Sequence, residues 1–297
     1  MRQFKILKKS GSIFFHVIFL VITLIVAYPI IWTLTSSLKS TKEIFGGSLS
    51  WFPDGFEWSY LLPANWDQLL SVFQFNNYDT AWNLAQFDQY FLNTIIFSGL
   101  VVFIVVSVCA LTGYVLGRYA FPGKLVFIAA IIATMFIPNE YSIIPMWQLI
   151  NFLGLEKSLF GLVLAEVGGA HVIYILLFTA YFSGLPKELE DSASIDGAGF
   201  LRTFLQIMLP LAKPVIASTA ILQFINAWNS FLIPLIFTIQ RPDLRTLGVG
   251  MYSFVEENTA DLGGMAAGAS ISFIPIIIVF LFFQRYFVEG IAGSVKG

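Results

Sequence analysis

Six long runs of mostly apolar residues set the limits on what this sequence can fold into. A bilayer core about 30 Å thick is crossed by about 20 residues of α-helix. The composition agrees, because the chain is 57% hydrophobic and only 11% charged, whereas about a quarter of the residues in a soluble domain are charged. The sequence therefore predicts an all-α membrane protein with six transmembrane helices, at residues 13–35, 91–117, 124–146, 159–182, 213–237 and 267–288.

Four prolines lie inside or at the ends of these apolar runs: Pro138, Pro145, Pro234 and Pro275. A proline in a transmembrane helix frees a backbone carbonyl, which neighbouring helices or water must then satisfy. The prolines therefore predict that the spans pack against one another as a bundle and do not lie separately in lipid.

Lys and Arg are shared unequally between the two sets of loops that six spans define. If the N-terminus is cytoplasmic, eleven of these residues lie on the cytoplasmic side and five on the external side. Because short cytoplasmic loops carry an excess of Lys and Arg, both termini are predicted to be cytoplasmic. The chain then divides into a cytoplasmic N-terminus at 1–12 and a six-span domain at 13–297, with external loops at 38–90 and 238–266, a cytoplasmic loop at 183–212 and a cytoplasmic tail at 289–297.

Several classes of protein and site are disfavoured by what the sequence lacks. No basic run indicates a nucleic-acid partner, and the one cysteine, Cys109, excludes an intramolecular disulfide and a cysteine-based metal cluster. The sequence contains no P-loop, no H-E-x-x-H and no G-x-S-x-G pattern. It therefore predicts no catalytic residue, no metal site and no cofactor bound by this chain.

A polar insert, Glu188–Pro214, interrupts the apolar sequence on the predicted cytoplasmic side. Pro186 can start a first short helix, whose opening turns carry acidic residues that suit the positive end of the helix. Gly197 or Gly199 can end that helix, because glycine adopts a left-handed conformation at low cost. A second, amphipathic helix is predicted from Phe200 to Leu209. The insert is therefore expected to be two short helices joined by a turn.

Two interpretations of this insert are open on physical grounds. It can be an ordinary loop that lies on the membrane surface. It can also be a docking surface, since the small side chains of Ser192, Ala193, Ser194 and Ala198 leave a flat face against which a partner can pack closely.

The spacing within the insert resembles a known signature. Asp191-Ser192-Ala193 is followed after three residues by Gly197, after nine more by Ile207, and after one more by Leu209-Pro210. This pattern is similar to the EAA signature (E-A-A-x3-G-x9-I-x-L-P) of permease subunits in bacterial ABC importers. The first two positions depart from it, with Asp191 for Glu and Ser192 for Ala.

Two further stretches resemble the carbohydrate-uptake branch of those permeases, in particular the maltose-transporter G-type subunit. Phe224–Leu235 is similar to the F-x3-WN-x-FL-x-PL pattern of its fifth span, and the final stretch, QRYFVEGIAGSVKG, is similar to its C-terminal tail. The resemblance implies a type I ABC importer permease fold with a cytoplasmic coupling-helix loop.

The resemblance also implies partners and site residues. The insert would couple to a cytoplasmic ATPase subunit through Glu190, Asp191, Ser192, Ala193, Asp196, Gly197, Ile207, Leu209 and Pro210. Two such ATPase subunits would bind ATP and Mg²⁺, while a second permease subunit, as a heterodimer, and an extracytoplasmic sugar-binding protein would complete an importer in a bacterial or archaeal cytoplasmic membrane. Alternating access would then carry an oligosaccharide or related carbohydrate inward.

Two candidate contact regions lie outside the insert. Asn226, Trp228 and Asn229 combine amide groups with an aromatic face, which suits a sugar pathway, but the same side chains can equally pack and hydrogen-bond between spans. In the external segment, Glu256, Glu257, Asn258 and Asp261 resemble a loop that contacts the sugar-binding protein. A plain surface loop is the alternative there.

Other functions predict features that the sequence does not display. A stand-alone secondary transporter or channel is the main alternative, and it predicts an inverted repeat or a coupling-ion site. The ionisable residues Glu166 and His171 lie five positions apart in the fourth apolar run, and this separation does not place them on one helical face. The sequence therefore favours a permease subunit that depends on an ATPase in another chain.

Overall fold

The computed structural model describes residues 2–46, 50–169, 171–255 and 260–294. The regular structure of these residues is helical, apart from an isolated antiparallel bridge between Val255 and Ala260. The chain forms two compact units, Met1–Phe87 with Met251–Phe273 and Asp88–Gly250 with Ile274–Gly297.

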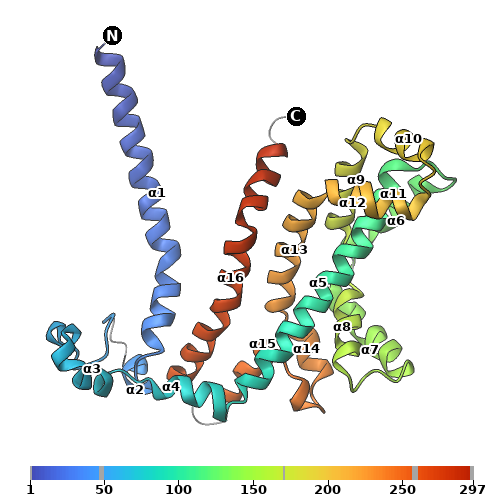
Figure 1. Cartoon of the computed structure of the whole chain (residues 1–297). Helices are drawn as coiled ribbons and strands as arrows, with labels where there is room; N and C mark the ends of the chain where they lie inside the picture. The colour runs from blue at the N-terminus through green and yellow to red at the C-terminus, as the bar shows by residue number, and fades with distance from the viewer. Residues whose placement is uncertain (1, 47–49, 170, 256–259, 295–297) are drawn as a thin grey trace. The chain divides into compact units, whose positions relative to one another are not determined.

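The first unit begins with the long helix α1 (Arg2–Ser36), drawn in blue in Figure 1. Its segment Phe14–Ser36 is long and apolar enough to cross a membrane, and no residue in the apolar 18-residue window of that segment is buried inside the protein. The exposed side chains are mainly large apolar ones, as expected for a helix that is surrounded by lipid. The first predicted span is therefore present as one continuous helix.

A series of short helices follows α1 in the first unit. Aromatic side chains hold part of this segment together, because Phe52 and Phe56 stack with ring centroids 4.3 Å apart and both rings pack edge-on against Trp58. The predicted external loop 38–90 thus contains structure of its own, made of α2 (Thr41–Phe45), η1 (Trp58–Leu61), η2 (Pro63–Asn65), α3 (Trp66–Val72), α4 (Asn76–Asp79) and η3 (Thr80–Leu84).

Asn77 ties this segment to the end of α1. Its side-chain amide donates to the backbone carbonyls of Ser37 and Lys39, both at 2.9 Å. Nearby, the Thr41 hydroxyl donates to Asp261 at 2.9 Å, just before α16 (Leu262–Ser294) begins. These bonds fix the start of the short-helix segment within the first unit.

Replacing Asn77 with Leu is expected to loosen this junction. The substitution leaves two partly buried carbonyls without their donor, which costs about 1–3 kcal/mol. Amide hydrogen exchange over residues 37–46 should accelerate accordingly. Asn83→Leu is the matched control, because the exposed Asn83 amide donates only to Asp79 within the same helical segment and surface changes of this kind stay within about 0.5 kcal/mol. Equal exchange rates in the two variants would contradict the anchoring role of Asn77.

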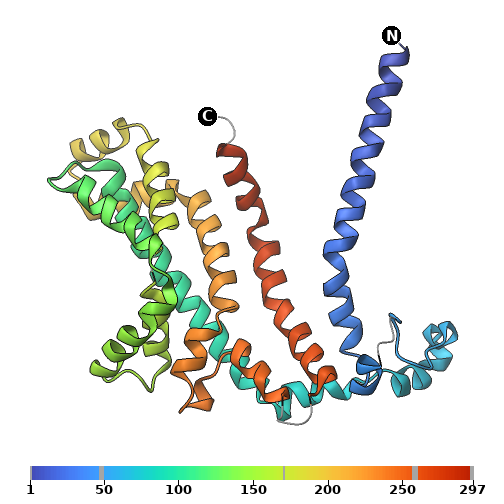
Figure 2. The ribbon, with the colours of Figure 1, turned by 180° about the vertical axis from the view of Figure 1, so that it is seen from behind.

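The second unit is organised around α5 (Phe87–Arg118), as Figure 2 shows from behind. Its core contains fully buried Tyr114, Phe97, Phe178, Phe182 and Met208, contributed by helices that are distant in sequence. The remaining helices before the polar insert are α6 (Lys124–Ala133), η4 (Thr134–Phe136), η5 (Asn139–Ser142), α7 (Ile143–Phe152), α8 (Leu159–Val167) and α9 (Val172–Ser183). Those after it are α13 (Lys213–Trp228), α14 (Leu232–Phe237), η7 (Pro242–Leu244) and α15 (Leu247–Gly250), while η8 (Met251–Phe254) begins the return to the first unit.

Two glycines let α5 and α9 approach closely. A Cβ atom at Gly113 would overlap the Phe178 side chain and lie 2.9 Å from the backbone nitrogen of Thr179, and one at Gly117 would lie 2.9 Å from the carbonyl oxygen of Thr179. The four-residue spacing places both glycines on one helical face. Such small residues are the common device for close packing of helices in membranes.

Three helices are unbroken candidate spans among the described residues: Phe14–Ser36, Phe87–Arg118 and Leu262–Gln284. The predicted span at 124–146 is instead two shorter apolar helices, α6 with η4 and then α7. Pro138 is the physical reason, because a proline disfavours helical geometry in the preceding residue. Ile137 accordingly adopts an extended conformation, with φ −96° and ψ 114°.

The predicted spans at 159–182 and 213–237 are also interrupted. The first consists of α8 and α9, bent by 65° at the break. The second stops at Trp228, and α14 follows after a short break. A helical stretch at Phe200–Leu211 joins α13 at an angle of 78°. With each bent pair taken as one span the candidates number up to five, so the count of six remains a prediction.

Candidate functional site

The polar insert forms the two short helices that the sequence predicts. The first is α10 (Glu188–Ile195), and the second is a helical stretch composed of α11 (Phe200–Thr203), the π-helical segment η6 (Phe204–Met208) and α12 (Leu209–Leu211). Figure 1 shows both beside the end of α5 that carries Arg118. We refer to residues 183–212 as the α10–α11 loop.

Gly197 makes the turn between the two helices. Its φ of +77° lies in the left-handed region, where a side chain is strained and glycine is not. The Gly197 amide donates to the carbonyl of Ser194 at 3.1 Å, and the Ala198 amide donates to the carbonyl of Ala193 at 2.9 Å. The last carbonyls of α10 are therefore satisfied, as in common glycine-terminated helix ends.

One face of α10 is exposed to the surroundings. Four of the residues predicted for coupling lie there: Asp191, Ser192, Asp196 and Gly197. Beside them, the Ile195 side chain is 87% exposed, although the sequence analysis did not single it out. An isoleucine among acidic and small residues at the end of a polar helix is the signal that could have identified it.

Three more of the predicted coupling residues face the protein. Ala193 is buried, and Ile207 and Leu209 pack partly buried against the hydrophobic core. Pro210 is exposed in α12, near the end of the helical stretch that begins at Phe200. The signature residues of the second helix thus hold the α10–α11 loop in place beneath its exposed face.

Glu190 is directed toward α5. Its carboxylate accepts from Arg118 Nε at 2.7 Å and from Tyr114 Oη at 2.8 Å, and it forms an ion pair with Arg118 Nη2 at 2.6 Å. The two charged side chains are 4% exposed for Arg118 and 21% exposed for Glu190. Sequence reasoning missed Arg118 and Tyr114, since their partner lies more than 70 residues later in the chain.

The three candidate residues of the fifth apolar run lie in different surroundings. Trp228 is buried and packs against Phe91 and Phe224, with ring centroids 6.0 Å and 5.3 Å apart. Asn226 is exposed and donates to Tyr174 Oη at 3.1 Å, and the exposed Asn229 amide donates to the carbonyl of Ile225 at 2.8 Å. Packing between helices accounts for Trp228, while the two amides remain accessible.

The predicted binding-protein contacts are described only in part. Glu256, Glu257 and Asn258 lie outside the described residues. Asp261 precedes α16, and its carboxylate accepts from Thr41 and, at 3.0 Å, from the amide of Gly264. Asp261 therefore caps the start of a helix in addition to any contact it makes.

The segment around η7 is held to α5 by hydrogen bonds from a side chain of α5 to backbone carbonyls. The side-chain amide of Asn93 donates to the carbonyls of Asp243 and Arg245 at 2.8 Å and 3.0 Å. Arg241 pairs with Asp243 at 2.6 Å, and its hydrogen bond lowers the pKa of that carboxyl. This exposed pair and the Arg118–Glu190 pair are the two ion pairs among the described residues.

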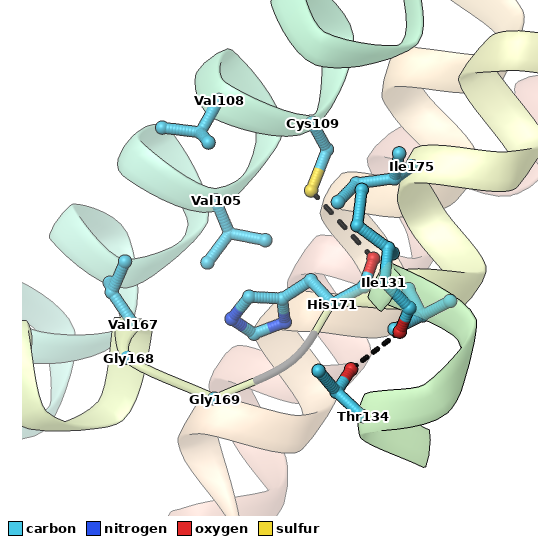
Figure 3. A pocket seen from close by; sticks show the side chains of 11 residues that line it. Val105, Val108, Cys109, Ile131, Thr134, Val167, Gly168, Gly169, His171 and Ile175 are labelled. Carbon is cyan, nitrogen blue, oxygen red and sulfur yellow. Dashed lines mark hydrogen bonds between the residues drawn. The ribbon is translucent and has the colours of Figure 1, made fainter. Parts of the chain in front are cut away.

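A pocket of about 350 Å³ lies at the break between α8 and α9 (Figure 3). Its walls are mostly apolar, with valine and isoleucine side chains from α5, α6, α8 and α9. The polar side chains at its edge are His171, Cys109 and Thr134, of which Thr134 donates to the carbonyl of Ile131. A sugar needs several polar partners, so this lining does not suit one.

The ionisable residues of the fourth apolar run do not form a relay. The Ser230 hydroxyl donates to Glu166 at 2.8 Å, whereas the His171 ring stacks on Tyr174 with centroids 6.0 Å apart. Within the described part of the chain, no cluster of three His, Cys, Asp or Glu side chains could hold a metal ion.

Known proteins with similar sequences and structures share this organisation. A chain from the crystal structure of a bacterial ABC transporter that imports the acidic polysaccharide alginate superposes with a TM-score of 0.74. The match covers 94% of this chain and 97% of the other, at 24% identity. The all-α importer permease fold expected from the sequence is therefore confirmed.

Three relatives match over most of their length. A probable ABC transporter permease, YurM of Bacillus subtilis, is 34% identical over 94% of this chain and 87% of its own. The diacetylchitobiose uptake permease NgcG of Streptomyces coelicolor is 34% identical over 95% and 86%. The arabinooligosaccharides permease AraQ of Bacillus subtilis is 29% identical over 99% and 98%.

The family assignment covers nearly the whole chain. Residues 5–293 match the family described as the inner membrane component of binding-protein-dependent transport systems. A membrane component agrees with the apolar helices of this chain that are long enough to cross a membrane. The chain belongs to the family of binding-protein-dependent transport system inner membrane components.

Proposed function

We propose that this chain is the permease subunit of an ATP-driven importer that takes up an oligosaccharide or a related carbohydrate. The observation that carries the proposal is the α10–α11 loop, whose exposed face is built on a fixed base at one end of the membrane helices. An extracytoplasmic binding protein delivers the sugar, and alternating access between two packed states carries it inward.

The exposed face of α10 is the docking surface for a cytoplasmic ATPase subunit. Asp191 and Asp196 supply negative charge, and Ser192 and Gly197 leave room for a close approach. Ile195 adds an apolar side chain that is 87% exposed before docking. An apolar anchor surrounded by polar groups is a common composition for a small interface.

The carbohydrate assignment rests on the relatives and on the fifth apolar run. NgcG is named for uptake of diacetylchitobiose and AraQ for uptake of arabinooligosaccharides. The exposed amides of Asn226 and Asn229 can exchange their present partners for sugar hydroxyl groups, while Trp228 packs behind them. These residues are the sugar pathway that this subunit contributes.

The complete importer contains further chains. A second permease subunit pairs with this one, and two ATPase subunits bind ATP and Mg²⁺, so this chain is not itself the hydrolase. Its six spans leave both termini in the cytoplasm, which also places the α10–α11 loop there. On the other side of the membrane, the segment that includes Glu256, Glu257, Asn258 and Asp261 meets the binding protein.

Gly197→Asp tests the docking surface. The new side chain projects into open space, because no atom lies within 4 Å of a Cβ built at this position, and Asp tolerates left-handed geometry better than most residues. We expect the variant to remain folded in the membrane and to lose its ATPase subunit during affinity purification of the complex.

Gly154→Asp is the matched control for that experiment. Gly154 also has a positive φ, of +70°, and also faces open space, but it lies between α7 and α8. It carries the same backbone strain without touching the docking surface. Equal retention of the ATPase by both variants would contradict docking at α10.

A further inference from the structure

Two neighbouring acidic residues of α10 have opposite surroundings. Asp191 is exposed on the docking surface. Glu190 is turned inward, where Arg118 and Tyr114 together satisfy both of its carboxylate oxygens. The carboxylate of Glu190 is therefore occupied within the chain, and of these two neighbours Asp191 is the one that α10 offers to a partner.

Arg118 binds more than this carboxylate. Its Nη1 donates to the carbonyls of Leu185 at 2.7 Å and Phe182 at 3.3 Å, and its Nη2 donates to the carbonyl of Pro186 at 3.2 Å. These carbonyls lie in the last turn of α9 and in the short segment that connects α9 to α10. We call Arg118, the Glu190 carboxylate and these three carbonyls the Arg118 clamp.

Arginine suits this position better than lysine does. A guanidinium group presents five N–H donors in a rigid, planar fork, whereas an ammonium group is a compact point charge. The fork reaches a carboxylate on one side and several carbonyls on the other. The side chain is 4% exposed, so water does not substitute for these partners.

Tyr114 and two glycines extend the same connection along α5. The Tyr114 ring packs against Phe182 of α9, Phe200 of α11 and Phe204 of η6, with centroids 5.2–5.5 Å apart. On either side of Tyr114 in the sequence, Gly113 and Gly117 bring the backbones of α5 and α9 close together. The cytoplasmic half of α5, the end of α9 and α10 are thus joined by packing, hydrogen bonds and charge.

We propose that Arg118 is a positioning residue that makes α5 the span driven by docking at α10. The proposal rests on the function proposed above and adds the route by which a displacement of α10 reaches the membrane. When the ATPase moves α10, the Arg118 clamp transmits the displacement to α5 through Glu190. The other exit from the loop turns by 78° before α13 and contains a π-helical segment, so it transmits a displacement less directly.

The test compares the assembled importer with and without a non-hydrolysable ATP analogue. Amide hydrogen exchange is measured along α5, and retention of the ATPase is measured in parallel. In the unaltered chain we expect the nucleotide to change exchange along α5. In the double variant Arg118→Gln/Glu190→Gln we expect the ATPase to be retained and the change along α5 to be lost.

The variants are chosen so that a loss of folding is not mistaken for a loss of the connection between α10 and α5. A lone Arg118→Gln change leaves a shielded carboxylate without its counter-charge, which is strongly destabilising, whereas the double variant removes both charges and keeps amides that can hydrogen-bond. Arg118→Lys keeps the ion pair and should restore part of the response along α5. Arg241→Gln removes the other, exposed ion pair of the second unit and should respond to the nucleotide as the unaltered chain does.

Two results would overturn the role of Arg118, and a third would overturn the proposed function. A nucleotide response along α5 that persists in the folded double variant would overturn the role of Arg118. Loss of the ATPase from the folded double variant, to the extent seen with Gly197→Asp, would also overturn it by making Glu190 a docking contact. Failure of the unaltered chain to retain any ATPase would instead overturn the proposed function, on which the clamp depends.

Discussion

Replacing Ile195 with Glu is expected to release the ATPase subunit and stop uptake, while the chain remains folded in the membrane. The Ile195 side chain is 87% exposed in the chain alone, so the substitution disturbs no internal packing. In the docked complex, burial of an isoleucine contributes about 1.5–3 kcal/mol. A buried, unpaired carboxylate would add a further penalty.

The size of this effect can be measured as ATPase affinity. Loss of the isoleucine contribution alone corresponds to a decrease of at least about tenfold, since each 1.4 kcal/mol is a factor of ten in affinity. Titration of the detergent-solubilised permease complex with its ATPase gives this ratio directly.

Ile239→Glu is the matched control, because Ile239 is also an exposed isoleucine but follows α14. It should bind the ATPase as the unaltered chain does. An Ile195→Glu variant with unaltered affinity would place the docking surface elsewhere.

Replacing Gly113 with Leu is expected to have the largest effect on folding. A Cβ at this position already overlaps Phe178 and presses on the backbone of Thr179, and neither can move without separating α5 from α9. Overpacking of a well-packed core costs about 1–3 kcal/mol or more. We expect Gly113→Leu to lower the free energy of unfolding by about 3 kcal/mol or more. The change should appear as a lower midpoint of thermal unfolding and as less folded protein in the membrane.

Gly99→Leu provides the comparison for Gly113→Leu within the same helix. Gly99 lies in α5, and a Cβ there would meet no atom within 4 Å. Leucine has a higher helix propensity than glycine by roughly 0.5–1 kcal/mol, so this variant should be as stable as the unaltered chain or more stable. If both leucine variants unfolded at the same temperature, the close α5–α9 packing would be contradicted.

Local chemistry made the two helices of the α10–α11 loop predictable. Acidic residues at the start of α10 and Gly197 at its end are signals that act over a few residues, and the structure has both features where they were expected. The span at 124–146 was less predictable. Membrane helices can tolerate proline, and the sequence alone does not show that Ile137 becomes extended before Pro138.

The environment of Glu190 could not be predicted from neighbouring residues. Its partners Tyr114 and Arg118 belong to α5, the helix whose Gly113 and Gly117 let α9 pack closely against it. The family signature marks the polar helix, but it does not separate an acid that faces a partner from its neighbour that faces the protein. That distinction depends on tertiary packing.

Uptake by reconstituted vesicles shows whether this chain is the permease subunit of an ATP-driven carbohydrate importer. The chain is placed in liposomes with its second permease and ATPase subunits, and labelled diacetylchitobiose, arabinooligosaccharides and other oligosaccharides are supplied outside with the binding protein. We predict accumulation of at least one of these sugars that requires ATP on the ATPase side and the binding protein on the other. Accumulation by this chain alone, without ATP or partners, would exclude a permease subunit that depends on an ATPase and would indicate a stand-alone transporter.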